Sequence, residues 1–290
     1  MRVLPALFAT ALAALAAGCS QPPKSENTVA ARQLAAIEAN RKGETYVRHG
    51  ELENAARSYR EALRLSQSLE DPEGIAANAI NLSIVRQRQG RFADARGSLA
   101  AVLEQPNLRF SAARLAEVAL RHALLDLDER RFSSAHDWVT RADQHCGQRC
   151  ALSGAIHNVR AQLALQAGQN EKAAASARAA HEASRAAGDR AELANALRLL
   201  GLAALRTGDA AAARAHLEQA LVLDREIGAP RKIVLDLLAL GRAAALGGER
   251  DAARAYYARA LAVSEADRDS AGAAEARALL DAVDKAATGK

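Results

Sequence analysis

A pattern of small and bulky apolar positions repeats along most of the chain, and short turns divide it into six units. The turns lie at Gly50, Gly90, Arg130, Gly168, Gly208 and Gly248, at spacings of 40, 40, 38, 40 and 40 residues. Seven residues before each turn stands a small residue: Gly43, Ser83, Ala123, Ala161, Gly201 or Gly241. Because glycine accepts the left-handed conformation that ends a helix, each turn predicts a helical hairpin.

A series of bulky residues, one in nearly every unit between the small residues just named, predicts how the hairpins pack. They recur as Tyr59, Leu99, Val139, Leu217 and Tyr257, and Ala177 breaks the series. Small residues let two helix backbones approach closely, and the bulky residue fills the gap to the next hairpin. One hairpin cannot cover its own apolar face, so the units must stack. A coiled coil would need unbroken heptads, and the regular glycines argue against it.

The ends of the predicted helices carry capping signals. Asp71 precedes Pro72, and Asp189 has Glu192 three residues on, which is the spacing of a capping box. Residues 270–287 predict one further amphipathic helix that would close the C-terminal end of the stack. Its apolar face would hold Leu279, Leu280 and Val283.

The repeat resembles the tetratricopeptide family, most closely in its first unit. There the family's order and spacing are matched by Gly43, Tyr46, Gly50, Ala55, Tyr59 and Ala62. The usual period of the family is about 34 residues, so this chain resembles its longer variants. The resemblance implies an all-α protein, a right-handed α-solenoid of six hairpins over residues 30–268, with a capping helix and tail over 269–290.

Composition and charge fit such a fold and exclude one class of partner. Half of the residues are hydrophobic but only 3% are aromatic, which favours helices packed through alanine over sheets. The net charge is +5, with basic residues interspersed among acidic ones. Nucleic acid is therefore not expected as a partner, because neither a basic block nor a set of base-stacking aromatics is present.

The N-terminus carries an export signal. An apolar run from Val3 to Ala17 follows Arg2; it is too short to span a bilayer and matches a signal peptide. The residues that follow, Leu15-Ala16-Ala17-Gly18-Cys19, resemble the bacterial lipobox. This resemblance implies a leader over 1–18, lipidation of Cys19 and a tether over 19–29. The alternative is an ordinary signal peptide in which Cys19 is incidental.

The lipobox resemblance also implies a location. Such lipoproteins stay in the inner membrane when Asp follows the cysteine, whereas Ser20 stands here. We therefore expect a protein anchored by lipid in the outer membrane, facing the periplasm. Its partners would be envelope proteins of pilus, secretin, outer-membrane protein or cell-wall machinery.

In the tetratricopeptide family, the first helix of each hairpin lines a concave wall where ligands lie. The polar residues expected on this wall are Glu44, Arg48, Asn81, Arg88, Arg121, Asn158, Gln162, Asn195, Arg198, Arg206 and Arg242. Arginine grips carboxylates and asparagine pairs with peptide groups, so extended or acidic peptide segments are the expected ligands. The alternative is that these are ordinary solvated helix faces. The family's clamp for peptide carboxylates is not intact, because Asn40, Glu44 and Glu117 occupy three of its positions.

Two further cysteines, Cys146 and Cys150, lie between the third and fourth units. In an oxidising compartment we expect them to form a local disulfide, with two free thiols as the alternative. His145 and His157 flank the pair, but their spacing matches no common zinc site, so no metal is expected.

No catalytic motif is present, so neither an enzyme nor a cofactor is expected. The sequence thus predicts a scaffold or adaptor that binds peptide segments in its concave groove. The alternative function is a solenoid that binds a small ligand or cell-wall fragment. A deep pocket lined by Arg121, Asn158 and Arg198 would favour this alternative.

Overall fold

The computed structural model describes residues 28–288, except for 106, 148 and 149. The leader, Cys19 and most of the tether lie outside the described residues. Within them the chain forms thirteen α-helices and no strand. The helices are α1 (Val29–Arg48), α2 (Leu52–Ser68), α3 (Pro72–Arg88), α4 (Phe92–Leu103), α5 (Ala112–Asp128), α6 (Phe132–Cys146), α7 (Ser153–Gln166), α8 (Asn170–Ala187), α9 (Arg190–Arg206), α10 (Ala210–Ile227), α11 (Pro230–Leu246), α12 (Arg250–Ala266) and α13 (Ser270–Thr288).

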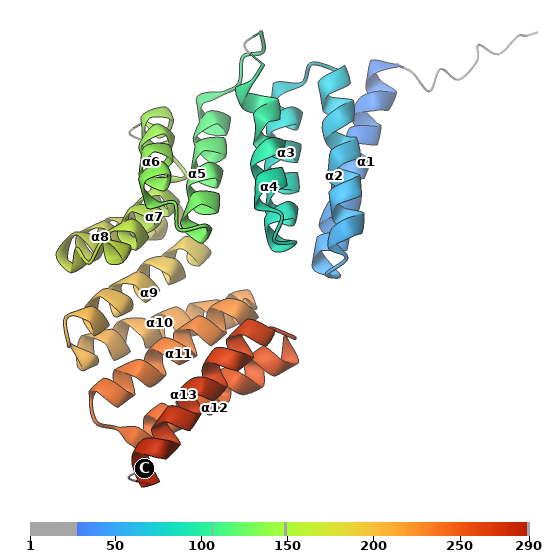
Figure 1. Ribbon diagram of the computed structural model, residues 1–290. Coiled ribbons are helices and arrows are strands. Elements are labelled where there is room, and N and C mark those ends of the chain that lie inside the picture. Colours follow the sequence, from blue (N-terminus) through green and yellow to red (C-terminus); the bar gives the residue numbers. More distant parts are fainter. Residues whose placement is uncertain (1–27, 106, 148–149, 289–290) are drawn as a thin grey trace, which may run out of the picture.

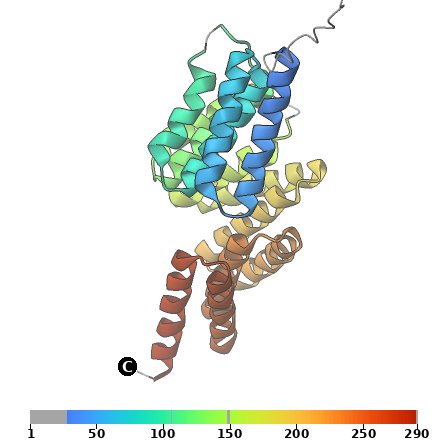
Figure 2. The same ribbon diagram turned by 90° about the vertical axis from the view of Figure 1, so that its right-hand side faces the viewer.

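The helices form consecutive hairpins stacked into an arc. Each odd-numbered helix up to α11 packs against the helix that follows it, and α13 packs against α12. In Figure 1, α1 to α6 stand upright side by side, whereas α8 to α13 run obliquely below them. Figure 2 shows these two groups of helices from the side. The predicted fold class is confirmed: an all-α solenoid.

The six predicted turn residues share one backbone conformation. Their φ angles lie between +57° and +82°, which is the left-handed region. Five of them are glycines, which adopt this region without a steric clash. The third, Arg130, has φ of +57° despite its side chain, so this turn carries strain that the others avoid.

Pairs of residues sixteen positions apart set the distance between the two helices of a hairpin. A Cβ atom added at Gly43 would lie 2.6 Å from the Tyr59 ring, and one at Gly241 would lie 2.2 Å from the Tyr257 ring. In the fourth hairpin the equivalent pair is Ala161 and Ala177, which share one apolar cluster. The small Ala177 is therefore paired with Ala161, which is larger than the glycines that are paired with Tyr59 and Tyr257.

The stack is looser at two junctions. α4 ends at Leu103 after 12 residues, and it packs less extensively on α5 than α2 packs on α3. α6 likewise packs less extensively on α7 than α8 packs on α9. The change of direction in Figure 1 falls at this second junction, so the arc has two arms that meet between α6 and α7.

Two predicted caps behave differently from each other. Asp189 accepts hydrogen bonds from the backbone N–H groups of Ala191 and Glu192, as a helix cap should. Asp71 precedes α3 without a side-chain capping bond. No helix in the described part of the chain is both long and apolar enough to cross a bilayer.

Candidate functional site: a leucine-lined groove

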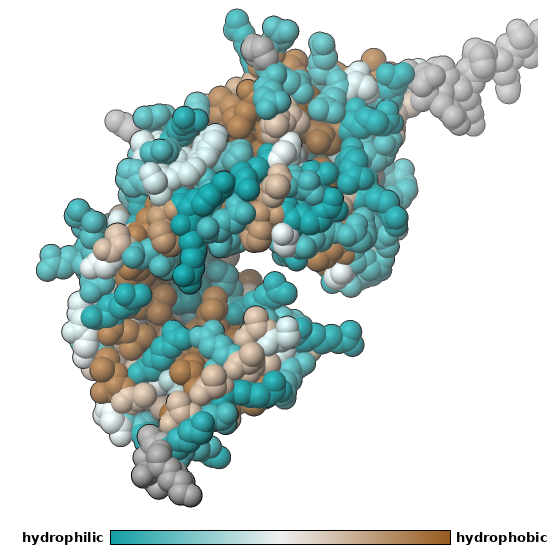
Figure 3. Space-filling view, in the orientation of Figure 1, coloured by the Kyte–Doolittle hydropathy of each residue, from teal (hydrophilic) through white to brown (hydrophobic). Residues whose placement is uncertain are grey.

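A large hollow lies on the concave side, across the junction of the two arms. It has a volume of about 710 Å³, and its walls come from α5, α7, α9, α11 and Glu275 of α13. The hollow is visible between the upper and lower parts of the molecule in Figure 3. Its apolar lining is dominated by leucines: Leu120, Leu124, Leu165, Leu199, Leu202, Leu205, Leu235, Leu238 and Leu246.

Six of the eleven predicted wall residues line this groove, and five do not. The six are Asn158, Gln162, Asn195, Arg198, Arg206 and Arg242. The other five lie on α1, α3 and α5 and do not line the groove: Glu44, Arg48, Asn81, Arg88 and Arg121. The structure therefore concentrates the predicted residues in the second arm.

Three of the predicted residues do not face solvent, and this corrects the interpretation of the wall as freely presented polar groups. Arg121, Asn158 and Arg198 are buried, with 9%, 6% and 6% exposed. Arg121 donates to the Ser83 hydroxyl at 3.3 Å and to the Gln87 side chain. Burial lowers the pKa of Arg121 to about 10, so the guanidinium stays charged at neutral pH. These side chains face a neighbouring repeat. Their burial could not be predicted from the sequence of a single repeat.

Arg198 is held between two buried carboxylates. Its Nε donates to Asp236 at 2.6 Å, and its Nη2 donates to Asp224. Asp224 and Asp236 are 2% and 0% exposed. Burial raises the pKa of Asp236 to about 7. The charge of Asp224 also raises it, because one arginine can neutralise only one of the two carboxylates. The second oxygen of Asp236 has no hydrogen-bond partner within the described residues.

A strip of hydrogen bonds leads from this buried cluster along the groove. Arg198 Nη1 donates to Asn195 Oδ1 at 2.9 Å, and Lys232 Nζ donates to the same oxygen at 3.1 Å. Asn195 donates to the Glu192 carboxylate at 3.2 Å. Asn158 donates to that carboxylate at 2.7 Å. The strip thus joins α7, α9 and α11 across the leucine walls.

Glu192 has a different role from the predicted one. In a capping box its carboxylate would accept from the backbone N–H of Asp189, but that N–H donates to the Ser184 carbonyl. The carboxylate instead accepts from two asparagines of the strip. The prediction of a reciprocal box was wrong, because the Ser184 carbonyl takes the Asp189 N–H and the Glu192 carboxylate is held by Asn195 on its own helix and by Asn158 of α7.

Lys232 is a groove residue that the sequence analysis missed. Water reaches its side chain, yet the groove walls surround the ammonium group. This desolvation, with the positive charge of Arg198, lowers the pKa of Lys232. The leucine lining was missed as well, since leucine on a repeat helix normally indicates core. Four of the leucines fall outside the small and bulky packing positions: Leu199, Leu202, Leu205 and Leu235. This departure from the packing pattern was the signal in the sequence that could have indicated a leucine-lined surface.

The two cations at the other end of the groove differ in their partners. Arg242 forms an ion pair with Glu275 of α13. Arg206 is exposed, and no ion pair or hydrogen bond of its side chain is found among the described residues. Arg206 is thus available to an acidic group of a ligand.

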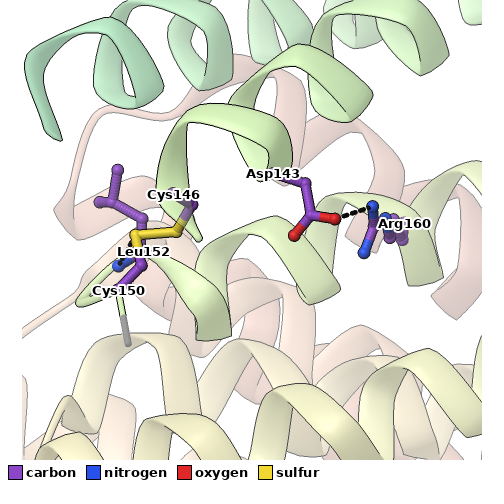
Figure 4. Close-up of a disulfide and its surroundings, with 5 residues drawn as sticks. All are labelled: Asp143, Cys146, Cys150, Leu152 and Arg160. Carbon is purple, nitrogen blue, oxygen red and sulfur yellow. Dashed lines mark hydrogen bonds and ion pairs between the residues drawn. A yellow bond between two sulfur atoms is a disulfide. The ribbon is translucent and has the colours of Figure 1, made fainter. Parts of the chain in front are cut away.

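Cys146 and Cys150 form a disulfide at the junction of the two arms, with 5.2 Å between their Cα atoms (Figure 4). Cys146 ends α6, and the Leu152 backbone N–H approaches the Cys150 sulfur at 3.4 Å. Near this bond, Asp143 pairs with Arg160 at 2.8 Å. Burial lowers the pKa of His157. No group of three or more metal-binding side chains is found in the described part of the chain.

Comparisons with known proteins agree with the fold. The tetratricopeptide repeat profile matches residues 39–69. No curated protein sequence matches the chain.

Several solved structures share the architecture. BtubC from P. vanneervenii is 20% identical with a TM-score of 0.57, over 82% of this chain and 93% of that one. A Rap protein complexed with competence and sporulation factor is 13% identical with a TM-score of 0.63, over 87% and 71% of the two chains. PilF of Pseudomonas aeruginosa is 18% identical with a TM-score of 0.54, over 85% and 98%. The chain is thus a helical-repeat solenoid, and more particularly one that contains a tetratricopeptide repeat.

Proposed function

We propose that this protein is a non-enzymatic adaptor that binds a peptide segment of a partner protein in the leucine-lined groove. The observation that carries the proposal is the groove itself, in which apolar walls from four repeats flank a hydrogen-bonded polar strip. Leucine walls would take the apolar side chains of a peptide. The strip offers groups that can pair with its backbone.

The cations of the groove favour a peptide with acidic character. Arg206 and Lys232 stand at opposite ends of the groove, and neither belongs to an ion pair among the described residues. A segment with an apolar centre and acidic flanks complements this arrangement.

The cellular setting is the second part of the proposal. The lipobox-like Leu15-Ala16-Ala17-Gly18-Cys19 and the following Ser20 support an anchor in the outer membrane with the solenoid in the periplasm. Envelope proteins are then the partners, and neither a cofactor, a metal nor nucleic acid takes part. Acyl labelling of wild-type protein and of Cys19→Ser, followed by membrane fractionation, tests this setting. Unlabelled wild-type protein would contradict it.

The groove proposal is tested by photo-crosslinking in cells. A photo-reactive amino acid at Leu235, 46% exposed in the groove, should capture a specific protein. The matched control is Val222 of α10, which is 52% exposed and does not line the groove. Leu202→Asp should abolish the capture from Leu235. Equal capture from both positions would count against a groove-bound partner.

A small ligand is the second candidate, because about 710 Å³ falls within the range of about 300–1,000 Å³ that holds drug-sized molecules. Asn158 and Arg198 line this hollow as that alternative required, whereas Arg121 does not. Native mass spectrometry of the purified protein separates the two functions. A bound small molecule that Leu202→Asp releases, with no captured protein, would favour the second.

A further inference from the structure

The two ends of the solenoid are finished differently. At the C-terminal end, α13 packs Leu279, Leu280 and Val283 against the repeat core and leaves charged residues exposed. At the N-terminal end, α1 is the outermost helix (Figures 1 and 2). Its Val29, Leu34 and Ile37 are 64%, 68% and 52% exposed. Three of the nine exposed large apolar side chains of the described residues therefore lie on this one helix.

The place of Leu34 in the repeat explains why it is uncovered. The equivalent residues are Gly74, Arg114, Leu152, Glu192, Lys232 and Gly272. The polar ones bond to the preceding unit, since Arg114 donates to Glu73, Glu192 accepts from Asn158 and Lys232 donates to Asn195. The closest approach is at the two glycines, Gly74 and Gly272. A Cβ atom added there would lie 2.5 Å from the Ser66 hydroxyl and 2.7 Å from the Ser264 hydroxyl, respectively. The position thus faces the second helix of the preceding unit. No described unit precedes α1, so its Leu34 has nothing to pack against, whereas solenoids normally end in polar surface.

The exposed face of α1 changes character along the helix. Residues 30, 34, 37, 41, 44 and 48 share one face at helical spacing. The first half of this face is apolar, with Ala30, Leu34 and Ile37, and the second half is charged, with Arg41, Glu44 and Arg48. The apolar half is the one nearer the N-terminus. An apolar patch beside an arginine suits the boundary between lipid headgroups and acyl chains, where apolar side chains enter the acyl region and a cation meets the phosphates.

We propose that the bilayer surface covers the N-terminal end of the solenoid, with Leu34 and Ile37 in the headgroup boundary and Arg41 above it. This rests on the lipid anchor of the proposed function. Val29 follows Cys19 by ten positions, a reach of at most about 35 Å. Since the anchor holds α1 at a high effective concentration beside the bilayer, a weak apolar contact suffices. The membrane then takes the place of a capping repeat.

The test uses the full-length lipidated protein in vesicles of phosphatidylethanolamine and phosphatidylglycerol, with or without bromine on the acyl chains. Ile37→Trp places a fluorescent probe on α1. Val222→Trp is the matched control on α10, because both residues are 52% exposed. Trp138, the single tryptophan of the chain, gives the same background in both variants. Bromine should quench the added fluorescence of Ile37→Trp about twofold and leave that of Val222→Trp unchanged.

The outcomes separate the failure of this inference from that of the anchor. Lipidated Ile37→Trp protein that bromine does not quench overturns the docking while the anchor stands. Quenching that persists in the double variant Leu34→Ser/Arg41→Glu of the same probe protein also overturns it. A mass spectrum without acyl chains overturns both. Burial of the probe in a dimer without lipid, seen as a doubled sedimenting mass, assigns the face to a second copy and contradicts the proposal.

Discussion

The two arms of the solenoid use the same positions of the repeat for buried polar networks of different chemistry. In the first arm, Asn40 donates to Asn78 at 2.6 Å, and Asn78 donates to Ser66 at 3.3 Å. In the second arm, Arg198, Asp224 and Asp236 stand at the same sequence offsets of 26 and 38 residues. Amides and a hydroxyl in one arm are thus replaced by three ionisable groups in the other.

This difference shows what the repeat dictates and what it leaves open. The backbone arrangement brings the three positions together in both arms, whatever residues occupy them. The neutral version satisfies its groups at little cost, whereas the charged version must desolvate an arginine and two carboxylates. The charged version lies where Arg198 reaches the groove through Asn195. The costlier network therefore coincides with the candidate binding site.

Removing the residue at the shared first position of each network, Arg198 or Asn40, is the strongest way to break the comparison. Arg198→Ala leaves two buried carboxylates without their cation and should lower the free energy of unfolding by about 3–5 kcal/mol. Asn40→Ala, at the equivalent position, should lower it by about 1 kcal/mol. Urea unfolding followed by circular dichroism measures both. Equal losses would mean that the charge of the second network has no energetic weight.

Acidification should move the arms in opposite directions. Asp236 has a folded-state pKa raised to about 7, so the folded state binds a proton that the unfolded state releases. The second arm should therefore gain stability as the pH falls from about 7.5 to 5. His122 of α5 stacks on Trp138 at 4.2 Å, and burial lowers its pKa to about 4. The first arm should lose stability as the pH falls below about 6.5, because the unfolded chain then binds the extra proton.

Hydrogen exchange followed by mass spectrometry reports the two arms separately. The expected changes are of order 1–2 kcal/mol in each arm. Asp236→Asn and His122→Phe should each abolish the pH dependence of their own arm and leave that of the other. A common pH dependence of both arms would contradict local titration.

Glycine-to-alanine changes test whether the two arms are equal in packing. Gly43→Ala and Gly241→Ala both drive a methyl group into a tyrosine ring, at opposite ends of the stack. Each should cost about 1–3 kcal/mol, because the ring must shift in a filled core. Tyr59→Leu in the first variant and Tyr257→Leu in the second should restore part of the loss. A large difference between the two, by thermal unfolding, would show that the arms differ in more than polar chemistry.

The smallest effect is expected at Arg130, which among the six predicted turn positions is the one that is not glycine. Arg130→Gly should stabilise the first arm by up to about 1 kcal/mol, since it relieves a left-handed conformation at φ of +57°. Gly90→Ala in the same arm is the control, and it should destabilise through the opposite effect. A shift in melting temperature measures both, and destabilisation by Arg130→Gly would indicate that the arginine side chain holds the turn.

The fold was predictable because its determinants recur within one repeat. Turn glycines and small residues at fixed offsets reflect contacts within a hairpin, so each unit repeats the evidence. The burial of Arg198 was not predictable, because its carboxylates lie 26 and 38 residues away in other helices. The leucine groove was missed for a related reason. Whether Leu235 faces the core or the concave side depends on how the stacked repeats curve, and no local pattern encodes that curvature.

The disulfide gives the junction of the arms a mechanical role. Cys146 and Cys150 tie the end of α6 to the segment that leads into α7, at one of the two junctions where neighbouring units pack less extensively. The groove draws its walls from α5 on one side of this joint and from α9 and α11 on the other. A rotation at this joint would change the opening of the groove, so we expect the Cys146–Cys150 bond to limit that change and its reduction to allow more of it.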